Sequence, residues 1–352
     1  MPRQATGRVT LTDVATQAGV SPSTVSYILR RVEPHFSRYA KATIARVQRA
    51  AEDAGYAPNL LATALRHQKL PFFGVFFEMI RRGDSGFTGG LPTIMWDVYE
   101  GIARTARQDH RYPVVLTSPA EHEGLTESPA ELDLIVRSGL CGVIAAVHSE
   151  TWRDHVARWE RAGISCVSLF DRGGEDEERW CVDLDNRAVG QMALDHLQEH
   201  GHSKIICVHQ PDSGTAVSDR VEAFAGAQIE AGLKPVVMEL ANNEALRTDF
   251  VSRLRKLGAT AVFAADGGAS ILAYQSLSDA GLNIPDECSV VGIDVAPGHD
   301  AAHRITQISC PGRLVGERAA KLLSTLLQGK APDKHAILVK PEVRYRHGVR
   351  RL

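Results

Sequence analysis

The sequence of 352 residues lacks the features that mark several large classes of protein. No stretch approaches the roughly 18 to 20 consecutive apolar residues that a membrane-spanning helix requires. The phosphate-binding patterns GxxxxGKS/T and GxGxxG are absent, which leaves nucleotide-dependent enzymes with little support. The first residues include basic side chains but no continuous apolar segment or cleavage site, so they do not indicate a secretory signal. We therefore expect a cytoplasmic protein.

Cysteine is sparse, and its spacing excludes the common cysteine motifs. The six cysteines lie far apart and form no CxxC pair, and Cys166 and Cys207 fall within apolar runs. Buried, reduced thiols are typical of such positions. We therefore expect neither a disulfide framework nor a cysteine metal site, and no cofactor.

Neither sign of charge is in excess, but the charge is unevenly distributed. The whole chain has a formal net charge of −2. Residues 1–68 contain nine Lys or Arg and four Asp or Glu, a net of +5, whereas the other 284 residues contain 31 and 38, a net of −7. A basic head on an acidic body suggests that only one end of the chain binds a polyanion.

Beyond about residue 70, short apolar runs alternate with segments of helical spacing. The runs are nearly continuous in apolar residues, which is typical of strands inside parallel sheets. Repeated strand and helix units predict a doubly wound α/β architecture. About 280 residues are too many for one such core, so we expect two lobes with a ligand-binding cleft between them. The predicted strands are residues 71–77, 112–118, 141–147, 164–170, 204–209, 235–240, 261–266 and 289–294.

The first 68 residues contain no strand-like run and predict a small all-α head. Gly19 allows a turn after a first helix, and Ser21 is placed to cap a second helix in which Pro22 takes the first position. Two short helices joined in this way form a helix-turn-helix. A third helix is expected over about residues 41–54, where apolar residues fall on one stripe.

Five sequence blocks, taken in their order along the chain, carry a resemblance to a known family. They are VTLTDVATQAGVSPSTVS (9–26), GYAPNLLATALR (55–66), ALDHLQEHGHSKI (193–205), SDRVEAFAGA (218–227) and GLNIPDECSVVGID (281–294). Together they resemble the lactose-repressor (LacI/GalR) family of bacterial transcription regulators. The resemblance implies a DNA-binding head, a hinge helix and a two-lobed core of periplasmic-binding-protein type I. It also implies that His196 and His202 close a helix, which leaves a metal site at His196, His200 and His202 with little support.

The head is expected to bind DNA through the start of its second helix. A recognition helix enters the major groove with its N-terminal residues at the base edges. Hydroxyl groups and helix N-termini bond phosphates, which fix the register without recognising sequence. Thr10, Ser21 and Thr24 are placed for this second task. The residues of the head expected to contact DNA are Thr10, Ser21, Pro22, Ser23, Thr24, Ser26, Tyr27 and Arg30.

One position in this helix departs from the family pattern. Family members commonly carry an arginine suited to guanine where this sequence has Tyr27. Tyrosine cannot make the bidentate guanine contact of arginine, so the operator should differ at that position. We predict that Pro22, Ser23 and Tyr27 set the base preference. The connection over residues 30–40 is also several residues longer than is usual in the family.

Residues 58–66 resemble the hinge helix of the family. Pro58 suits a first helical position, but about nine residues are too few for a stable isolated helix, so we expect it to depend on DNA and the partner subunit. The resemblance places Leu65 as a wedge in the minor groove, with Ala62 and Asn59 as its neighbours on DNA. The alternative is that the leucines of this segment pack on the core as ordinary linker residues.

Charged residues at the ends of predicted strands are the candidate effector-binding residues. The resemblance places Asp171 at the mouth of the cleft, Arg220 against ligand hydroxyls or carboxylates, and Asp294 on the opposite lobe. These three groups suit a sugar or a similar polar metabolite, although each of the three could instead form a structural ion pair or cap. Asp266 must serve alone or not at all, because Gly267 follows it where the family has a second polar side chain. Candidate aromatic stacking partners are Trp96, Trp180 and Phe224.

The domain boundaries follow from these assignments. We expect residues 1–57 to form the helix-turn-helix domain, residues 58–68 the hinge helix and linker, and residues 69–352 the effector-binding and dimerisation core. The expected N-lobe is about residues 69–175 plus 307–330, and the expected C-lobe is about residues 176–306 plus 331–352.

The sequence thus predicts a repressor that binds a palindromic operator as a dimer and responds to a small polar metabolite. The segment after Gly348 carries no heptad pattern, so we expect a dimer and not a tetramer. Two alternatives remain: a solute-binding protein without a DNA role, and an enzyme on the same α/β scaffold. We expect no enzymatic activity, because the sequence offers no convergent set of acid, base and nucleophile.

Overall fold

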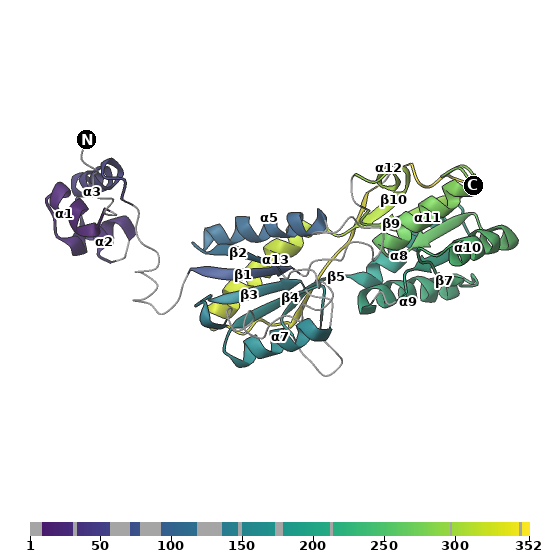
Figure 1. Ribbon diagram of the computed structural model, residues 1–352, viewed down its shortest axis with the longest axis horizontal. Helices are drawn as coiled ribbons and strands as arrows, with labels where there is room; N and C mark the ends of the chain where they lie inside the picture. Colours follow the sequence, from purple (N-terminus) through teal and green to yellow (C-terminus); the bar gives the residue numbers. More distant parts are fainter. Residues whose placement is uncertain are drawn as a thin grey trace. The chain divides into compact units, whose positions relative to one another are not determined.

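The computed structural model describes ten ranges of the chain, which form two compact units, residues 1–70 and 71–352 (Figure 1). We describe each unit by itself. The described residues are 9–30, 34–56, 71–77, 93–117, 136–146, 150–172, 179–211, 214–295, 298–344 and 347–352.

Within residues 9–30 and 34–56 the head forms the three α-helices that its sequence predicts, together with one 3-10 turn. The elements are α1 (Leu11–Ala18), α2 (Pro22–Arg30), η1 (Phe36–Arg38) and α3 (Lys41–Asp53). Val14, Val25, Ile28 and Val47 are fully buried and join the three helices in one apolar core. The head therefore has a core of its own.

Local signals in the sequence explain where these helices begin and end. Thr10 caps α1 in a capping box with Asp13, in which each side chain bonds the backbone of the other. Gly19 ends α1 in the left-handed region, at φ 63°, which glycine adopts without steric cost. The Thr24 N–H donates to Ser21 Oγ at 3.1 Å, so Ser21 caps α2 as expected.

The first sheet of the second unit is parallel throughout, with the strand order β11-β5-β4-β3-β1-β2. Alternate residues of β1 face opposite layers, since Phe73 packs with the cluster of α5 and α13 and Phe76 packs with Trp159 of α7. Helices α5 and α13 lie together on one face and α7 covers the other (Figure 1). The elements are β1 (Phe72–Phe77), α5 (Thr93–Gln108), β2 (Tyr112–Thr117), β3 (Gly142–Ala146), α7 (Glu150–Arg161), β4 (Ser165–Leu169), β5 (Cys181–Leu184), α13 (Gly312–Leu327) and β11 (Ala336–Val339).

The second sheet has the order β12-β10-β9-β8-β6-β7, parallel except where β12 pairs with β10. Phe263 of β8 packs with Phe224 on one side, and Val262 packs in the cluster of Phe250 on the other. The sheet is therefore covered on both faces. Its elements are α8 (Asn186–Glu199), β6 (Ile205–His209), α9 (Gly214–Glu230), β7 (Val237–Glu239), α10 (Glu244–Leu257), β8 (Ala261–Ala264), α11 (Gly267–Asp279), β9 (Ser289–Ile293), α12 (Ala301–Arg304), β10 (Thr306–Ser309) and β12 (Glu342–Arg344).

The eight strands and the α/β class predicted from the sequence are confirmed. The boundaries predicted for the lobes need correction at three strands. β5 and β11 belong to the first sheet, whereas their residues were expected in the C-lobe, and β10 belongs to the second sheet although the N-lobe was expected to begin again at residue 307. The chain passes between the sheets after β5, after β10 and after β11, and no local pattern marks these crossings.

Candidate DNA-binding head and interlobe ligand site

The second helix of the head exposes a polar face opposite its buried residues. Val25 and Ile28 are fully buried, whereas Ser23 and Tyr27, which lie four residues apart, share the opposite face of the helix. This face carries the residues expected at base edges. Arg30 is the last residue of α2, and its side chain lies outside the described residues, as do Asn59, Ala62 and Leu65.

Three of the hydroxyl groups expected at phosphates also stabilise the helix ends. Thr10 Oγ1 donates to the Asp13 carboxylate at 2.8 Å, and this bond and the one from the Thr10 N–H lower the pKa of Asp13. Ser21 Oγ and Thr24 Oγ1 lie 2.9 Å apart, within hydrogen-bonding distance. These contacts hold the hydroxyl groups at the helix N-termini, where a phosphate is best received.

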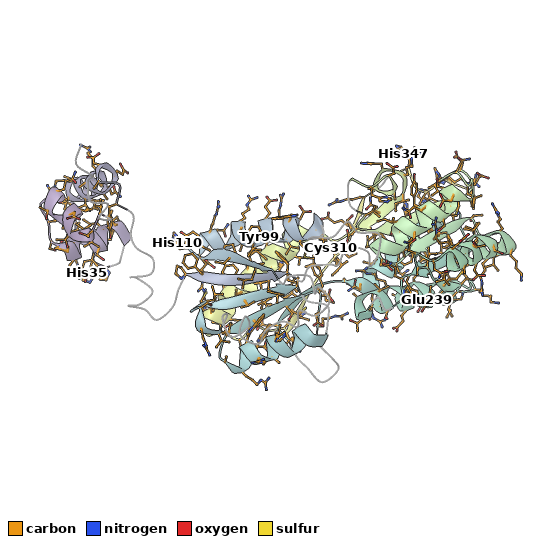
Figure 2. The ribbon with its side chains drawn as sticks, in the orientation of Figure 1. His35, Tyr99, His110, Glu239, Cys310 and His347 are labelled. Atoms are coloured by element: carbon orange, nitrogen blue, oxygen red, sulfur yellow. The ribbon has the colours of Figure 1, made fainter. Side chains whose placement is uncertain are left out.

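Sequence reasoning missed a contact of Tyr27, one of the residues expected to set the base preference. Its ring stacks on that of His35, with centroids 4.3 Å apart and 19° between the ring planes. His35 directly precedes η1 in the connection between α2 and α3 (Figure 2). The only signal in the sequence was the length of that connection.

Arg220 occupies the centre of the candidate ligand site in the second unit. Its Nε donates to Asn186 Oδ1 at 2.8 Å and its Nη1 to the carbonyl of Ala265 at 3.0 Å. Burial lowers the pKa of Arg220, while the carboxylates of Asp294, Asp266 and Asp183 oppose that shift. The guanidinium is thus oriented by α8 and by the end of β8.

Asp294 lies directly after β9 in an unusual backbone conformation, with φ 41°. Its two carboxylate oxygens accept from the N–H of Cys310 at 3.1 and 3.3 Å, where the chain leaves β10 (Figure 2). Burial raises the pKa of Asp294 to about 6, although the Cys310 N–H and the Arg220 guanidinium act in the opposite direction. Because the pKa of this carboxyl group lies close to neutral pH, a change in its surroundings alters its charge.

Both carboxylate oxygens of Asp266 accept hydrogen bonds from the backbone. One oxygen accepts from the Ala269 N–H at 2.7 Å, which caps α11, and the other accepts from the Gln210 N–H at 2.8 Å. Burial raises its pKa, and these two bonds oppose the shift. Asp266 therefore acts as a helix cap, a role that the sequence did not predict.

Asp171 forms a buried pair with Arg179, with Oδ2 and Nη1 3.7 Å apart. The neighbouring Arg172 was not predicted as a site residue. Its Nε lies 3.0 Å from Asp183 Oδ2, and its Nη2 bonds Asp219 of α9. Because Asp183 Oδ1 also accepts from Asn186 at 3.4 Å, a continuous polar network joins Arg172 to Arg220.

Phe224 was expected to stack on a ligand, and the structure contradicts this expectation. It is fully buried and stacks on Phe263, with centroids 4.7 Å apart, so it belongs to the core of the second lobe. Trp180 stacks on His335, which follows from the pairing of β5 with β11. Trp96 is 58% exposed on α5, and its stacking role stays a prediction.

Comparison with known proteins matches both units. The family described as "Bacterial regulatory proteins, lacI family" matches residues 10–59, and the "Periplasmic binding protein-like domain" matches residues 194–349. The chain belongs to the LacI family. It is 28% identical over 341 residues to the transcriptional regulator PtxS of Pseudomonas aeruginosa, covering 92% of this chain and 90% of that one.

Other members of the LacI family match over nearly their full length. The transcriptional repressor PurR of Vibrio campbellii is 23% identical, covering 97% of this chain and 99% of the relative. The lac repressor dimer bound to operator and the anti-inducer ONPF has a TM-score of 0.71 at 20% identity, covering 98% of this chain and all of that one. The complex of the regulator CelR with cellobiose has a TM-score of 0.63 at 21% identity, covering 97% and 100%.

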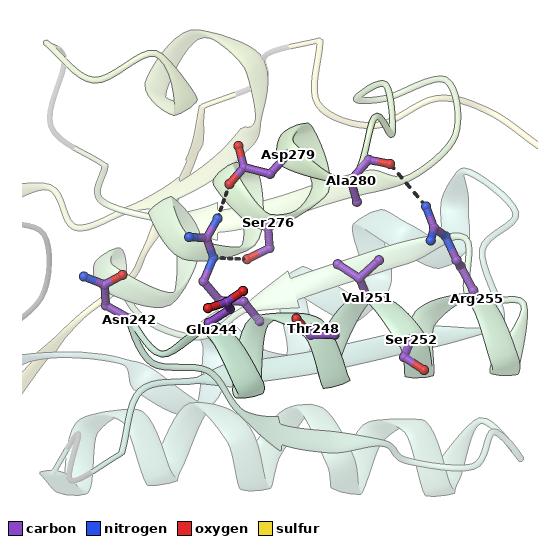
Figure 3. A pocket seen from close by; sticks show the side chains of 10 residues that line it. Asn242, Glu244, Thr248, Val251, Ser252, Arg255, Ser276, Asp279 and Ala280 are labelled. Carbon is purple, nitrogen blue, oxygen red and sulfur yellow. Dashed lines mark hydrogen bonds and ion pairs between the residues drawn. The ribbon is translucent and has the colours of Figure 1, made fainter.

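A surface groove of about 760 Å³ lies elsewhere on this LacI-family core, between α10 and α11 (Figure 3). Its two arginines are already bonded. Arg247 bonds Asp279 and donates to Ser276 Oγ at 3.0 Å, and Arg255 donates to the carbonyl of Ala280 at 3.2 Å. These bonds join the two helices. None of the described residues that line the groove belongs to the network around Arg220, so the two sites are separate.

His202, which follows α8 and was weighed as a metal ligand, has structural partners. His202 is almost fully buried, its Nδ1 lies 2.8 Å from Thr260 Oγ1, and its Nε2 lies 3.1 Å from the carbonyl of Arg350. Within the ranges that the structure describes, no group of three or more His, Cys, Asp or Glu side chains is placed to hold a metal ion. No helix in those ranges is long and apolar enough to cross a membrane.

Proposed function

We propose that this protein is a transcriptional repressor that binds a palindromic operator as a dimer and is controlled by a polar metabolite bound between its lobes. The observation that carries the proposal is the union in one chain of a capped helix-turn-helix and a two-sheet core with a polar network at its strand ends. Each head of a dimer contacts one half-site, so the symmetry of the operator follows that of the protein.

The head supplies both general and specific affinity for DNA. Its net charge of +5 over residues 1–68 attracts phosphates, and this contribution falls as salt rises. Base preference comes from Pro22, Ser23 and Tyr27 on the polar side of α2. Residues 1–57 are the proposed DNA-binding domain, and residues 58–68 the proposed hinge, with Leu65 wedged in the minor groove of the operator.

Arg220 and Asp294 are the proposed anchors for the metabolite. Nε and Nη1 of Arg220 donate to described residues, and among those residues Nη2 makes no bond, so Nη2 is the proposed donor to a ligand. Asp294 supplies acceptors from the end of β9, while Asp266 serves chiefly as a helix cap. A donor and acceptors facing one site suit the hydroxyl groups of a sugar or sugar derivative.

Control of DNA binding requires that the metabolite favour one arrangement of the lobes. The ion pair between Arg172 and Asp219 joins the two lobes, and the bond between Asp294 and Cys310 joins the ends of β9 and β10 at the point where the chain crosses from the second sheet to the first. A ligand that changes these contacts shifts affinity for DNA only as far as it binds one arrangement better than the other. The protein is proposed to act in the cytoplasm, where it meets the chromosome.

A screen of metabolites by thermal shift on the full-length protein tests this function. A ligand present at 100 times its dissociation constant stabilises the native state by about 2.7 kcal/mol. The expected hit is a sugar-like compound whose shift is lost in Arg220→Ala and kept in Arg247→Ala, which removes an arginine from the separate groove. The same compound must change the affinity of the protein for a selected operator.

The alternatives make different predictions in the same screen. A solute-binding protein would bind the metabolite without any effect of DNA on its affinity, whereas coupling between two sites is reciprocal. An enzyme would convert the compound to product. Recovery of the unchanged compound, together with a changed affinity for it when operator is present, supports the repressor.

A further inference from the structure

The connection between α2 and α3 holds His35 in a fixed position beside the recognition helix. Phe36 and Tyr39, which follow His35 in the chain, pack against the apolar core of the head. The Arg38 N–H donates to the carbonyl of His35 at 3.2 Å, and Ser37 Oγ donates to the carbonyl of Pro34 at 3.1 Å. The backbone at His35 is therefore anchored in the turn of η1.

This anchored ring restricts Tyr27. A tyrosine on an exposed helix face has several rotamers of similar energy, and Tyr27 lies on the face away from the buried Val25 and Ile28. The stack on His35, at 4.3 Å between centroids, favours one of these arrangements. Both rings are half-buried, so part of the pair remains accessible.

The rings of Tyr27 and His35 present a flat aromatic surface beside Ser23. In the proposed function this side of α2 enters the major groove. Apolar side chains in that groove contact the C5-methyl group of thymine, which distinguishes thymine from the other bases. The phenol hydroxyl and the imidazole nitrogens at the rim can bond a base edge or a phosphate. A surface of this kind suits a base pair that carries thymine.

We propose that His35 is a specificity-determining residue of the operator interface, which positions Tyr27 by stacking and gives it a preference for thymine at one base pair. The inference rests on the proposed function, since it requires an operator. Sequence recognition then depends on the connection between α2 and α3 as well as on α2 itself.

Selection of binding sites from random duplex DNA by the full-length protein tests this role. Tyr27→Ala and His35→Ala should both lose preference at the same single base pair, by about tenfold, which is within the discrimination that one base contact supplies. His35→Phe retains an aromatic partner for Tyr27 and should retain the preference. Arg38→Ala, in the same turn, is the control; it should lower affinity for all sequences alike and leave the selected bases unchanged.

Each result has a clear meaning. If His35→Ala selects the wild-type bases while Tyr27→Ala does not, His35 plays no part in recognition. If His35→Ala loses affinity for all sequences and lowers the melting temperature of the head, His35 is a structural residue and the proposal is wrong. If the wild-type protein enriches no sequence at all, the proposed function itself fails, and the inference fails with it.

Discussion

Arg172 of the first lobe bonds the carboxylate of Asp219 in α9 of the second lobe. The same guanidinium contacts Asp183, which is almost fully buried, with Nε and Oδ2 3.0 Å apart. One arginine thus compensates a buried carboxylate and joins the two lobes. These two tasks differ in energy, because Asp219 retains contact with solvent and Asp183 does not.

The two partners of Arg172 predict unequal effects of mutation. Arg172→Gln should destabilise the protein by about 1 to 3 kcal/mol, because it leaves the buried carboxylate of Asp183 without its counter-ion. Asp219→Asn removes only the more exposed pair and should cost less than about 1 kcal/mol. Urea unfolding of both variants measures the difference. Arg187→Gln, which removes a pair exposed on both sides, is the control and should have no effect; equal losses for Arg172→Gln and Asp219→Asn would contradict the assignment.

Arg220 predicts a destabilisation that depends on pH. Burial raises the pKa of Asp294 from its ordinary value of 3.8 to about 6, so this group contributes stability below about pH 4 that is lost as the pH rises through 6. Removing Arg220, which favours the charged form, should raise that pKa further. Arg220→Ala should therefore cost about 2 to 3 kcal/mol at pH 8 and clearly less at pH 5, where Asp294 is largely protonated in both proteins.

Urea unfolding at the two pH values measures this difference. Arg247→Ala is the matched control, since its partner Asp279 is exposed. Its effect should be the same at pH 5 and pH 8. A loss in Arg220→Ala that does not change with pH would show that the guanidinium does not act on Asp294.

Substitution of two serines in the head should have different effects, one on stability and the other on DNA binding. Ser21→Ala removes the cap of α2 and should destabilise the head by about 1 kcal/mol. Ser23 is exposed within the same helix, so Ser23→Ala should leave the melting temperature unchanged and alter only operator affinity. Circular dichroism and a DNA-binding assay on both full-length variants make the comparison. A stability loss in Ser23→Ala as large as in Ser21→Ala would contradict the assignment of the cap.

Local signals account for the parts of the fold that the sequence predicts. The capped turn at Gly19 and Ser21 and the eight apolar strands depend on residues close together in the chain. β5 and β11 escaped prediction because each has only four residues, β5 includes the charged Asp183, and the two pair across about half of the chain. The sheet to which such a strand belongs depends on where the chain crosses between lobes, and local periodicity does not report that.

In the candidate site, too, residues within local motifs were predicted and long-range contacts were not. Arg220 and Asp294 stood out because they lie within recognisable blocks, and the structure joins both to one network. Arg172 and Asp219 were missed since they are 47 residues apart and no local pattern links one to the other. Phe224 was misassigned because an apolar residue on a helix near a site has the same local pattern whether it faces a ligand or the core.

The contact between α5 and α13 predicts a severe effect for a single added methyl group. A Cβ on Gly316 would lie 1.9 Å from the carbonyl oxygen of Val98, and one on Gly101 would lie 2.1 Å from that of Arg313. The obstacle in each case is backbone, so the helices must separate. Gly316→Ala should therefore destabilise the protein by at least about 2 kcal/mol, despite the higher helix propensity of alanine.

The control for this prediction is Gly226, in the middle of α9. No atom lies within 4 Å of a Cβ built there, so Gly226→Ala should stabilise the protein by about 0.5 to 1 kcal/mol through helix propensity and reduced unfolded-state entropy. The two variants make the same chemical change in a helix and differ only in the space around it. Urea unfolding should therefore give changes of opposite sign, and a Gly316→Ala variant as stable as wild type would require α5 and α13 to lie farther apart than the structure places them.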